Sequence, residues 1–147
     1  MTKYFMVFLL GFLCSSYSFD QDNSSGKLII KVSGVRNQNG KIIISIFKSA
    51  DGFPGKPSKA EILAVGEINK NTAQVTVENI PFGDYAVSLV HDENDNKKME
   101  TNFLGIPNEG IGTSNDAKGT FGPPKFEQAK FKFSKDNQKI KINMVYY

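Results

Sequence analysis

Apolar and polar residues alternate along most of the chain after residue 26. Residues 27–33 and 41–47 each place every second residue on one apolar side, with polar residues opposite. This period of two is typical of a half-buried β-strand. The apolar positions of these two stretches are Leu28, Ile30, Val32, Ile42, Ile44 and Ile46. Because the turn-forming pair Asn39-Gly40 separates them, they predict a hairpin.

Five later stretches are also predicted as strands. They cover residues 62–68, 73–80, 85–91, 129–133 and 140–146. Residues 92–124 interrupt the pattern, because glycine and asparagine are frequent there and no periodicity is visible. No stretch of the mature chain shows a helical pattern. We therefore predict an all-β fold, a single antiparallel Greek-key β-sandwich of about seven strands, with a long Gly-rich loop between the fifth and sixth strands.

The N-terminus has a different composition from the rest of the chain. The run from Tyr4 to Leu13 is apolar, which is too short for a transmembrane helix and suits the core of a signal peptide. We predict a signal peptide over residues 1–18, a polar leader over 19–26 and the domain over 27–147. Two alternatives stay open: lipidation at Cys14, and an uncleaved membrane anchor. The protein is thus expected to be exported, and periplasmic or secreted.

Charge and cysteine content narrow the functional classes. The formal net charge is +3 and becomes +2 (3 − 1) when Lys3 leaves with the signal peptide. The lysines are spread along the strands, so the sequence predicts no nucleic-acid partner. No basic amphipathic helix is visible, and we expect no stable membrane span after signal cleavage. Cys14 is the only cysteine, so the mature domain has no disulfide and no closed zinc site.

An acidic and amide-rich loop follows the fifth predicted strand. Its oxygen-bearing residues alternate, and a glutamate comes shortly after; they are Asp92, Asn94, Asn96 and Glu100. Calcium prefers six to eight oxygen ligands, and this spacing can surround one side of the ion. Two interpretations stay open: a calcium site made by these four residues, or a polar turn whose Asn and Asp side chains bond their own backbone. Lys97 stands where calcium loops have glycine, which weakens the first.

His91 is the only histidine of the chain. Counting by twos places it on the same face as Val87 and Leu89, at the end of the fifth predicted strand. It could act as a general base oriented by Asp92 or Glu109, or it could bond a loop carbonyl at the sheet margin. No nucleophile elbow, phosphate loop or dinucleotide motif accompanies it. The sequence therefore favours a protein that is not an enzyme, with a hydrolase-like activity as an alternative.

Several short motifs together resemble an exported bacterial family, catalogued as domain of unknown function 2141. In chain order they are Gly83-Asp84-Tyr85-Ala86-Val87, the segment 91–96, the segment 102–110, Gly112-Thr113-Ser114-Asn115 and the segment 122–129. The resemblance implies a transthyretin-like or immunoglobulin-like sandwich in which Tyr85 is structural. Because the family has no assigned activity, it implies no catalytic residue.

The segment 92–124 is where we expect the function to lie. We predict a non-enzymatic binding or structural module that meets an unknown envelope or extracellular ligand through this segment. The candidate ligand contacts are His91, Glu109 and Asn115. Apolar residues of the segment, such as Phe103 and Phe121, either cap the core or face a partner. Calcium is the cofactor that the 92–100 loop would take.

Overall fold

The computed structural model describes residues 24–147, which are mostly β-structure, as the sequence predicts. Nine strands lie in this range, where the sequence predicts about seven. They are β1 (Ser25–Ser33), β2 (Lys41–Phe47), β3 (Ile62–Gly66), β4 (Ile68–Asn69), β5 (Thr72–Pro81), β6 (Gly83–Asp92), β7 (Gly110–Thr113), β8 (Phe131–Phe133) and β9 (Gln138–Asn143). The signal peptide predicted over residues 1–18, including Cys14, lies outside the described residues, as does most of the polar leader.

Helical structure is short wherever the chain is described. It consists of η1 (Pro57–Lys59), η2 (Ser114–Asp116) and α1 (Phe126–Ala129). The sequence predicts no helix, because four residues are too few to show a helical period. In residues 24–147 no helix has the length and apolar character needed to cross a membrane.

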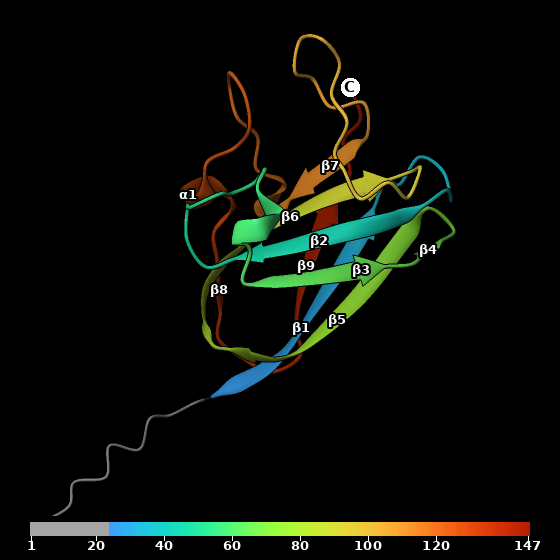
Figure 1. The fold of residues 1–147 in the computed structure, drawn as a ribbon. Coiled ribbons are helices and arrows are strands. Elements are labelled where there is room, and N and C mark those ends of the chain that lie inside the picture. The colour runs from blue at the N-terminus through green and yellow to red at the C-terminus, as the bar shows by residue number, and fades with distance from the viewer. Residues whose placement is uncertain (1–23) are drawn as a thin grey trace, which may run out of the picture.

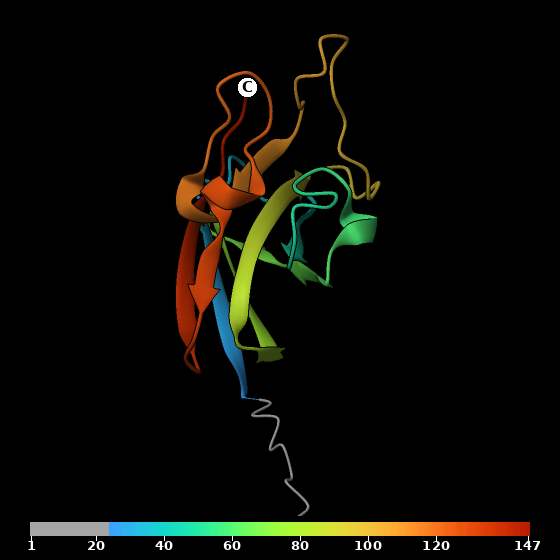
Figure 2. The ribbon, with the colours of Figure 1, turned by 90° about the vertical axis from the view of Figure 1, so that its left-hand side faces the viewer.

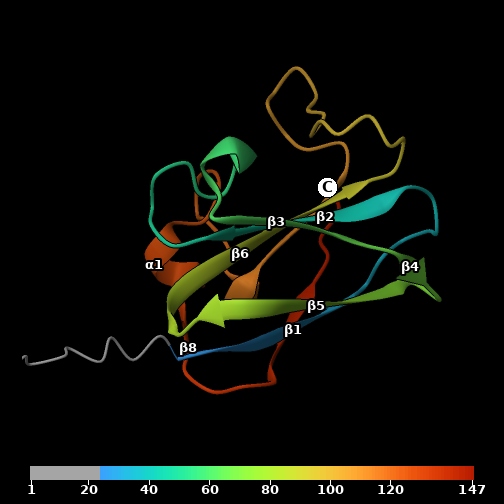
Figure 3. The same cartoon turned by 60° about the horizontal axis from the view of Figure 1, so that its bottom comes forward.

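The strands form two sheets (Figure 1). Sheet A has the order β4-β5-β1-β9. Sheet B has the order β3-β2-β6-β7, and β8 pairs with the first residues of β6. The two sheets lie as two layers, which Figures 2 and 3 show from the side and from below.

The core lies between the two sheets and consists of the apolar positions that the alternation selects. Its buried members include Leu28, Ile30, Val32, Ile42, Ile44, Ile46, Val87, Leu89, Phe133 and Ile142. Tyr85 is also buried, and its hydroxyl donates to the carbonyl oxygen of Pro81 at 2.9 Å. Burial of the ring and satisfaction of its hydroxyl confirm that Tyr85 has a structural role.

The predicted hairpin of the first two strands is wrong. β1 pairs with β5 and β9 in sheet A, whereas β2 pairs with β3 and β6 in sheet B. The connection therefore crosses from one layer to the other. Gly40 still has the φ of +62° that its turn requires, and a side chain there would collide with the carbonyl of Asp92. Local turn chemistry indicates a reversal, and it does not specify which strand becomes the neighbour.

Sheet A is also not purely antiparallel. β1 and β9 are parallel and in register from Leu28 opposite Gln138 to Ser33 opposite Asn143. The first and last strands of the domain thus lie side by side, which corrects the antiparallel prediction. Parallel neighbours need a long connection between them, and here the connection is the rest of the domain.

Further boundaries differ from the prediction, among them Ala129, which ends α1 instead of beginning a strand. The predicted strand 62–68 divides into β3 and β4, which belong to different sheets, because the chain changes layer after Gly66. A side chain at Gly66 would lie 2.9 Å from Val75, so glycine permits this close crossing. The predicted loop 92–124 contains β7, which pairs with β6. β7 is only four residues long, and two of them are glycine, so its alternation is not visible in the sequence.

Two long connections remain on either side of β7 and η2. They are residues 93–109 and residues 117–125, and both rise at the same end of the molecule as the C-terminus (Figures 1 and 2). This end therefore collects most of the segment in which the sequence places the function.

Candidate functional site

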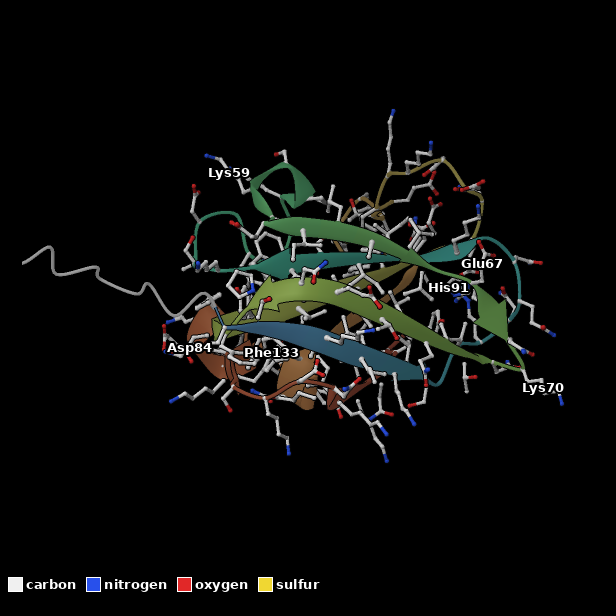
Figure 4. The ribbon with its side chains drawn as sticks, turned by 90° about the horizontal axis from the view of Figure 1, so that it is seen from below. Lys59, Glu67, Lys70, Asp84, His91 and Phe133 are labelled. Atoms are coloured by element: carbon white, nitrogen blue, oxygen red, sulfur yellow. The ribbon has the colours of Figure 1, made fainter. Side chains whose placement is uncertain are left out.

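His91 lies near the end of β6 and is fully buried, with 0% of its surface exposed (Figure 4). Its Nε2 is 2.8 Å from the carbonyl oxygen of Asn39, and its Nδ1 is 2.8 Å from the hydroxyl of Tyr146. A carbonyl only accepts, so Nε2 carries the proton and donates it to Asn39. Nδ1 then accepts a hydrogen bond from Tyr146. Both ring nitrogens of His91 therefore have a partner inside the fold.

The Tyr146 hydroxyl connects His91 to Arg36. It accepts a hydrogen bond from the Arg36 backbone N–H at 3.1 Å, and the Arg36 guanidinium lies over the tyrosine ring, 4.6 Å from its centroid. Burial raises the pKa of Tyr146, and the carboxylate of Glu93 acts in the same direction. The phenol therefore stays protonated at neutral pH and keeps its donor role toward His91.

Glu93 completes this cluster. Its Oε1 is 2.6 Å from the Arg36 guanidinium, and its Oε2 accepts a hydrogen bond from the Asn37 side chain at 2.7 Å. Burial alone raises the pKa of Glu93, but the hydrogen bonds from Arg36 and Asn37 outweigh it and hold the pKa below its usual value. The carboxylate is thus charged and paired at neutral pH.

The contacts of His91 correct its predicted surroundings. Its partners are Asn39 and Tyr146, and neither Asp92 nor Glu109 orients it. The expectation that it bonds a loop carbonyl at the sheet margin is confirmed. A buried ring with both nitrogens occupied cannot reach the proton of a substrate in this conformation. Sequence reasoning missed Arg36 and Tyr146, although Arg36 is the only arginine of the chain.

The 92–100 loop is held by its own side chains. The two Asp92 oxygens accept the backbone N–H groups of Asn96 at 3.1 Å and Lys97 at 2.7 Å. The Asn94 and Asn96 side-chain oxygens accept further N–H groups of the same loop. Lys97 has a φ of +61°, the conformation that glycine adopts in calcium loops of this spacing. These bonds match the polar-turn interpretation.

The four predicted cation ligands nevertheless converge. Asn94 and Asn96 point their amide nitrogens at Glu100 Oε1, at 3.3 and 2.8 Å. A cation would need amide oxygens there, and a half-turn of each amide supplies them only by giving up the backbone N–H groups that these oxygens now accept. Asp92 would have to share oxygens that now accept backbone N–H groups. In residues 24–147 no group of three or more His, Cys, Asp or Glu side chains is arranged to hold a metal ion.

Glu109 and Asn115 stabilise loops. Glu109 is 5% exposed, and its two oxygens accept the N–H groups of Glu93 at 3.3 Å and Glu100 at 3.4 Å. Burial raises the pKa of Glu109. Asn115 has a φ of +61° and donates to the carbonyl oxygen of Lys130 at 2.9 Å. In the structure, His91, Glu109 and Asn115 each make hydrogen bonds within the fold, and their role as ligand contacts stays a prediction.

The outer face of sheet B carries an apolar row that crosses four strands and the C-terminal segment. Strand register places its members directly opposite one another, in the order Val65, Ile43, Val90, Ile111 and Val145. A parallel row of small hydroxyl residues lies beside it, formed by Ser45, Ser88 and Thr113. Cross-strand neighbours on one face act as a continuous surface. The alternation pattern in the sequence did not predict this row, because it assigns these positions to the solvent-facing side of each strand.

Loops enclose this face and form a groove of about 1180 Å³. The floor contains Ile43, Val90 and Ile111, all half-buried. The walls come from parts of three loops, namely residues 54–55 and 57, residues 97–99 and 104–107, and residues 116–120 and 122–124, together with Tyr147. Most of the lining is apolar, and Lys97, Lys98 and Lys118 lie at the rim. His91, Glu109 and Asn115 are not part of the lining. This combination of an apolar floor and a few polar groups is typical of a ligand site.

Comparison with known proteins gives one match. The family model described as "Uncharacterized protein conserved in bacteria (DUF2141)" matches residues 30–141. No curated protein and no solved structure matches the chain. The matched range extends from β1 into β9 and includes the groove floor and the 92–100 loop.

Proposed function

This chain belongs to the DUF2141 family of uncharacterized proteins conserved in bacteria, and from this premise we propose that it is an exported, non-enzymatic binding module. Its ligand site is the groove on the outer face of sheet B. The ligand is an apolar chain or ring system that lies across β2, β6 and β7, between the two long loops. The scaffold is a Greek-key β-sandwich, a class supported by the two layers with one shared core.

One observation carries this proposal. Five apolar residues in register cross the outer face of a sheet whose inner face already forms the core. A solvent-facing sheet surface normally alternates to polar residues, so the row has no role in the core. Ile43, Val90 and Ile111 are half-buried and line the groove together with residues of the surrounding loops. An apolar ligand would remove the remaining surface from water, at about 25 cal/mol per Å².

The test is a pair of isosteric substitutions in the same row. Val90→Thr places a hydroxyl on the groove floor, whereas Val65→Thr makes the same change on β3, outside the groove lining. The apolar fluorescent probe N-phenyl-1-naphthylamine is titrated into each protein. We expect Val90→Thr to weaken binding about fivefold, which corresponds to about 1 kcal/mol, and Val65→Thr to bind like the unchanged protein.

Equal probe binding by both variants would contradict the groove as the site. The melting temperature of each variant is measured alongside, so that a folding defect is separated from a binding defect. Val90 and Val65 both belong to the outer face, so neither substitution enters the core.

Export is the second part of the proposal. It is supported by the apolar run from Tyr4 to Leu13. Fractionation of cells that produce the full chain tests it, with Edman or mass-spectrometric determination of the mature N-terminus. Cleavage after Ser18 and recovery outside the cytoplasm are expected. A full-length protein in the cytoplasmic fraction would refute export.

The non-enzymatic character is supported by the position of His91. A general base needs a free nitrogen that reaches substrate, and both nitrogens of His91 are engaged inside the fold. His91→Gln tests this directly. We expect it to lower stability and leave probe binding in the groove unchanged in the folded fraction.

A calcium-stabilised loop is a second candidate function, favoured by the convergence of Asp92, Asn94, Asn96 and Glu100. Calcium would then raise the melting temperature, and a chelator would lower it, by ligand linkage. Asn94→Ala together with Asn96→Ala should abolish this response. Asn108→Ala, on an exposed asparagine outside the cluster, is the control. An unchanged melting temperature at millimolar calcium would exclude this candidate.

A further inference from the structure

Two turns at one end of the fold expose large aromatic side chains. Within residues 24–147, Phe103 is 93% exposed and Phe121 is 100% exposed. The first belongs to the connection after β6 and the second to the connection after η2, and both connections rise beside the C-terminus (Figures 1 and 2). Both connections supply lining residues to the same groove, but Phe103 and Phe121 themselves are not among them. Exposed apolar side chains on neighbouring turns at one end of a molecule mark a candidate interaction surface.

The first turn does not need its apolar residues for its shape. Asn102 Oδ1 accepts the N–H of Leu104 at 2.9 Å, and the N–H of Gly105 donates to the Asn102 carbonyl at 2.9 Å. Gly105 supplies a φ of +77°. Phe103 and Leu104, which is 68% exposed, occupy the two central positions and face water. The turn is thus a preformed platform that presents two apolar side chains.

Glycines shape the second turn in the same way. A Cβ on Gly119 would lie 2.1 Å from the carbonyl oxygen of Gly122, so the chain closes here only with glycine. Gly122 has a φ of +123°. Phe121 stands between them without a packing role, because its side chain is fully exposed. Both turns therefore hold an aromatic residue outward on a fixed backbone.

The charge of the two turns has one sign. Residues 101–108 contain no charged residue, and residues 117–126 contain Lys118 and Lys125 and no carboxylate. The two turns are thus apolar, with Lys118 and Lys125 on either side of Phe121, and exposed carboxylates, among them Glu100 and Asp116, lie just outside these two ranges. Such a surface is complementary to a lipid layer, which has an apolar interior and anionic headgroups at its surface.

We propose that this end of the molecule docks on a membrane surface, with Phe103, Leu104 and Phe121 inserted into the lipid interface. Aromatic and apolar side chains are stabilised at that depth, and anionic headgroups attract the adjacent lysines. A folded protein partner fits less well, because its interface closes over one continuous packed patch, and these side chains stand on two separate convex turns. The docking needs no ligand in the groove, although Leu104 belongs to both surfaces.

Fluorescence tests the insertion directly, because the chain contains no tryptophan. Phe103→Trp and Phe121→Trp each introduce a single reporter at a turn, and Val65→Trp introduces one on β3, where the side chain is 52% exposed. Each variant is mixed with vesicles of phosphatidylcholine and phosphatidylglycerol. We expect the emission of both turn reporters to shift to shorter wavelength, and that of Val65→Trp to stay unchanged.

Co-sedimentation with the same vesicles measures the affinity. Phe103→Ala combined with Phe121→Ala should lower the partition coefficient by roughly a hundredfold or more, because two aromatic side chains no longer leave water. Leu63→Ala combined with Val65→Ala, which removes two exposed apolar side chains from β3, is the matched control and should bind normally. All variants share one N-terminus, so their differences report the substituted positions alone. Both double variants should keep the melting temperature of the unchanged protein.

Three results would overturn the proposal. The first is an unshifted emission of both turn reporters in the presence of vesicles. The second is an equal loss of vesicle binding in the control variant. The third is vesicle binding that disappears in high salt without any emission shift, since that binding would be headgroup attraction alone.

Discussion

At the scale of single residues, the polar side chains that suggest chemistry in the sequence are used to hold loops. A polar group leaves water at a cost of about 1–3 kcal/mol unless it finds a hydrogen-bond partner. His91 finds Asn39 and Tyr146, and Asp92 finds two backbone N–H groups. The burial of His91 and Asp92 is therefore tolerated, because Asn39, Tyr146 and the backbone of the 92–100 loop supply the partners.

The Tyr146 hydroxyl is the centre of the buried cluster, and its removal is a sharp test. Tyr146→Phe leaves His91 Nδ1 and the Arg36 N–H without their partner. We expect the free energy of unfolding to fall by about 1–3 kcal/mol, measured by urea denaturation. Tyr147→Phe, at a neighbouring side chain that is 73% exposed, should change it by less than about 0.5 kcal/mol. If the two substitutions lowered the free energy of unfolding equally, the Tyr146 hydroxyl would not have the proposed role in the cluster.

The Glu93 carboxylate predicts a pH dependence. Its pKa is lowered in the folded state, so its contribution to stability is present above the unfolded value of about 4.5 and is lost as the pH falls through the folded value. The difference in unfolding free energy between the unchanged protein and Glu93→Gln should be constant near neutral pH and shrink below about pH 4.5. Urea titrations from pH 7 to pH 3 measure it. Glu67→Gln, at an exposed carboxylate, should show no such trend.

At the scale of secondary-structure elements, the parallel pairing of β1 and β9 places two lysines side by side. Lys31 and Lys141 are opposite each other on the outer face of sheet A, and no carboxylate of the described residues lies within 4.0 Å of either. Like charges directly opposite one another destabilise a strand pair. Protection of the sheet edge explains Lys141 on β9, which is an edge strand, but not Lys31 on the central strand β1.

This pair predicts a stabilising charge reversal. Lys141→Glu would face Lys31 and should raise the unfolding free energy by about 0.5–1 kcal/mol at low salt. Lys139→Glu makes the same change in net charge opposite Ile29, so it is the matched control and should have a smaller effect. Because both positions are exposed, the gain should vanish in high salt. A larger gain from Lys139→Glu would contradict the parallel register.

At the scale of the whole molecule, the first and last strands of the domain pair with each other. β9 lies beside β1, and the last residues pair with β7 through Ile111 and Val145. Ile142 and Met144 belong to the core, with 0% and 7% of their surfaces exposed. Contacts between the ends of a chain form only after the intervening chain is ordered, so cooperative folding should require the complete domain.

A pair of truncations tests this closure. Removal of residues 138–147 deletes β9 and uncovers the core side of β1, so we expect the chain to lose its near-UV circular dichroism and its cooperative unfolding transition. Removal of Tyr147 alone should preserve both, because that side chain packs on nothing in the core. A cooperative transition in the longer truncation would show that sheet A is complete without β9.

The sequence by itself determined the fold class, the inward face of the strands and the family. These follow from short stretches of sequence. Alternation assigns each side chain to one face of its strand, and a series of turn and loop motifs identifies the family. Strand alternation therefore correctly selects Leu28, Ile44 and Val87 for the core. The turn at Gly40 could also be predicted from the sequence, because it depends on the backbone conformation of that residue alone.

Only the tertiary structure decided which strands are neighbours. The parallel pairing of β1 with β9, the separation of β1 from β2 and the apolar row from Val65 to Val145 all join residues far apart in sequence. Alternation records whether a residue points inward or outward, and it carries no information on what lies beside that residue. The meeting of His91 with Arg36 and Tyr146 was hidden for the same reason. The groove and the two exposed turns exist because the fold brings distant loops to one end.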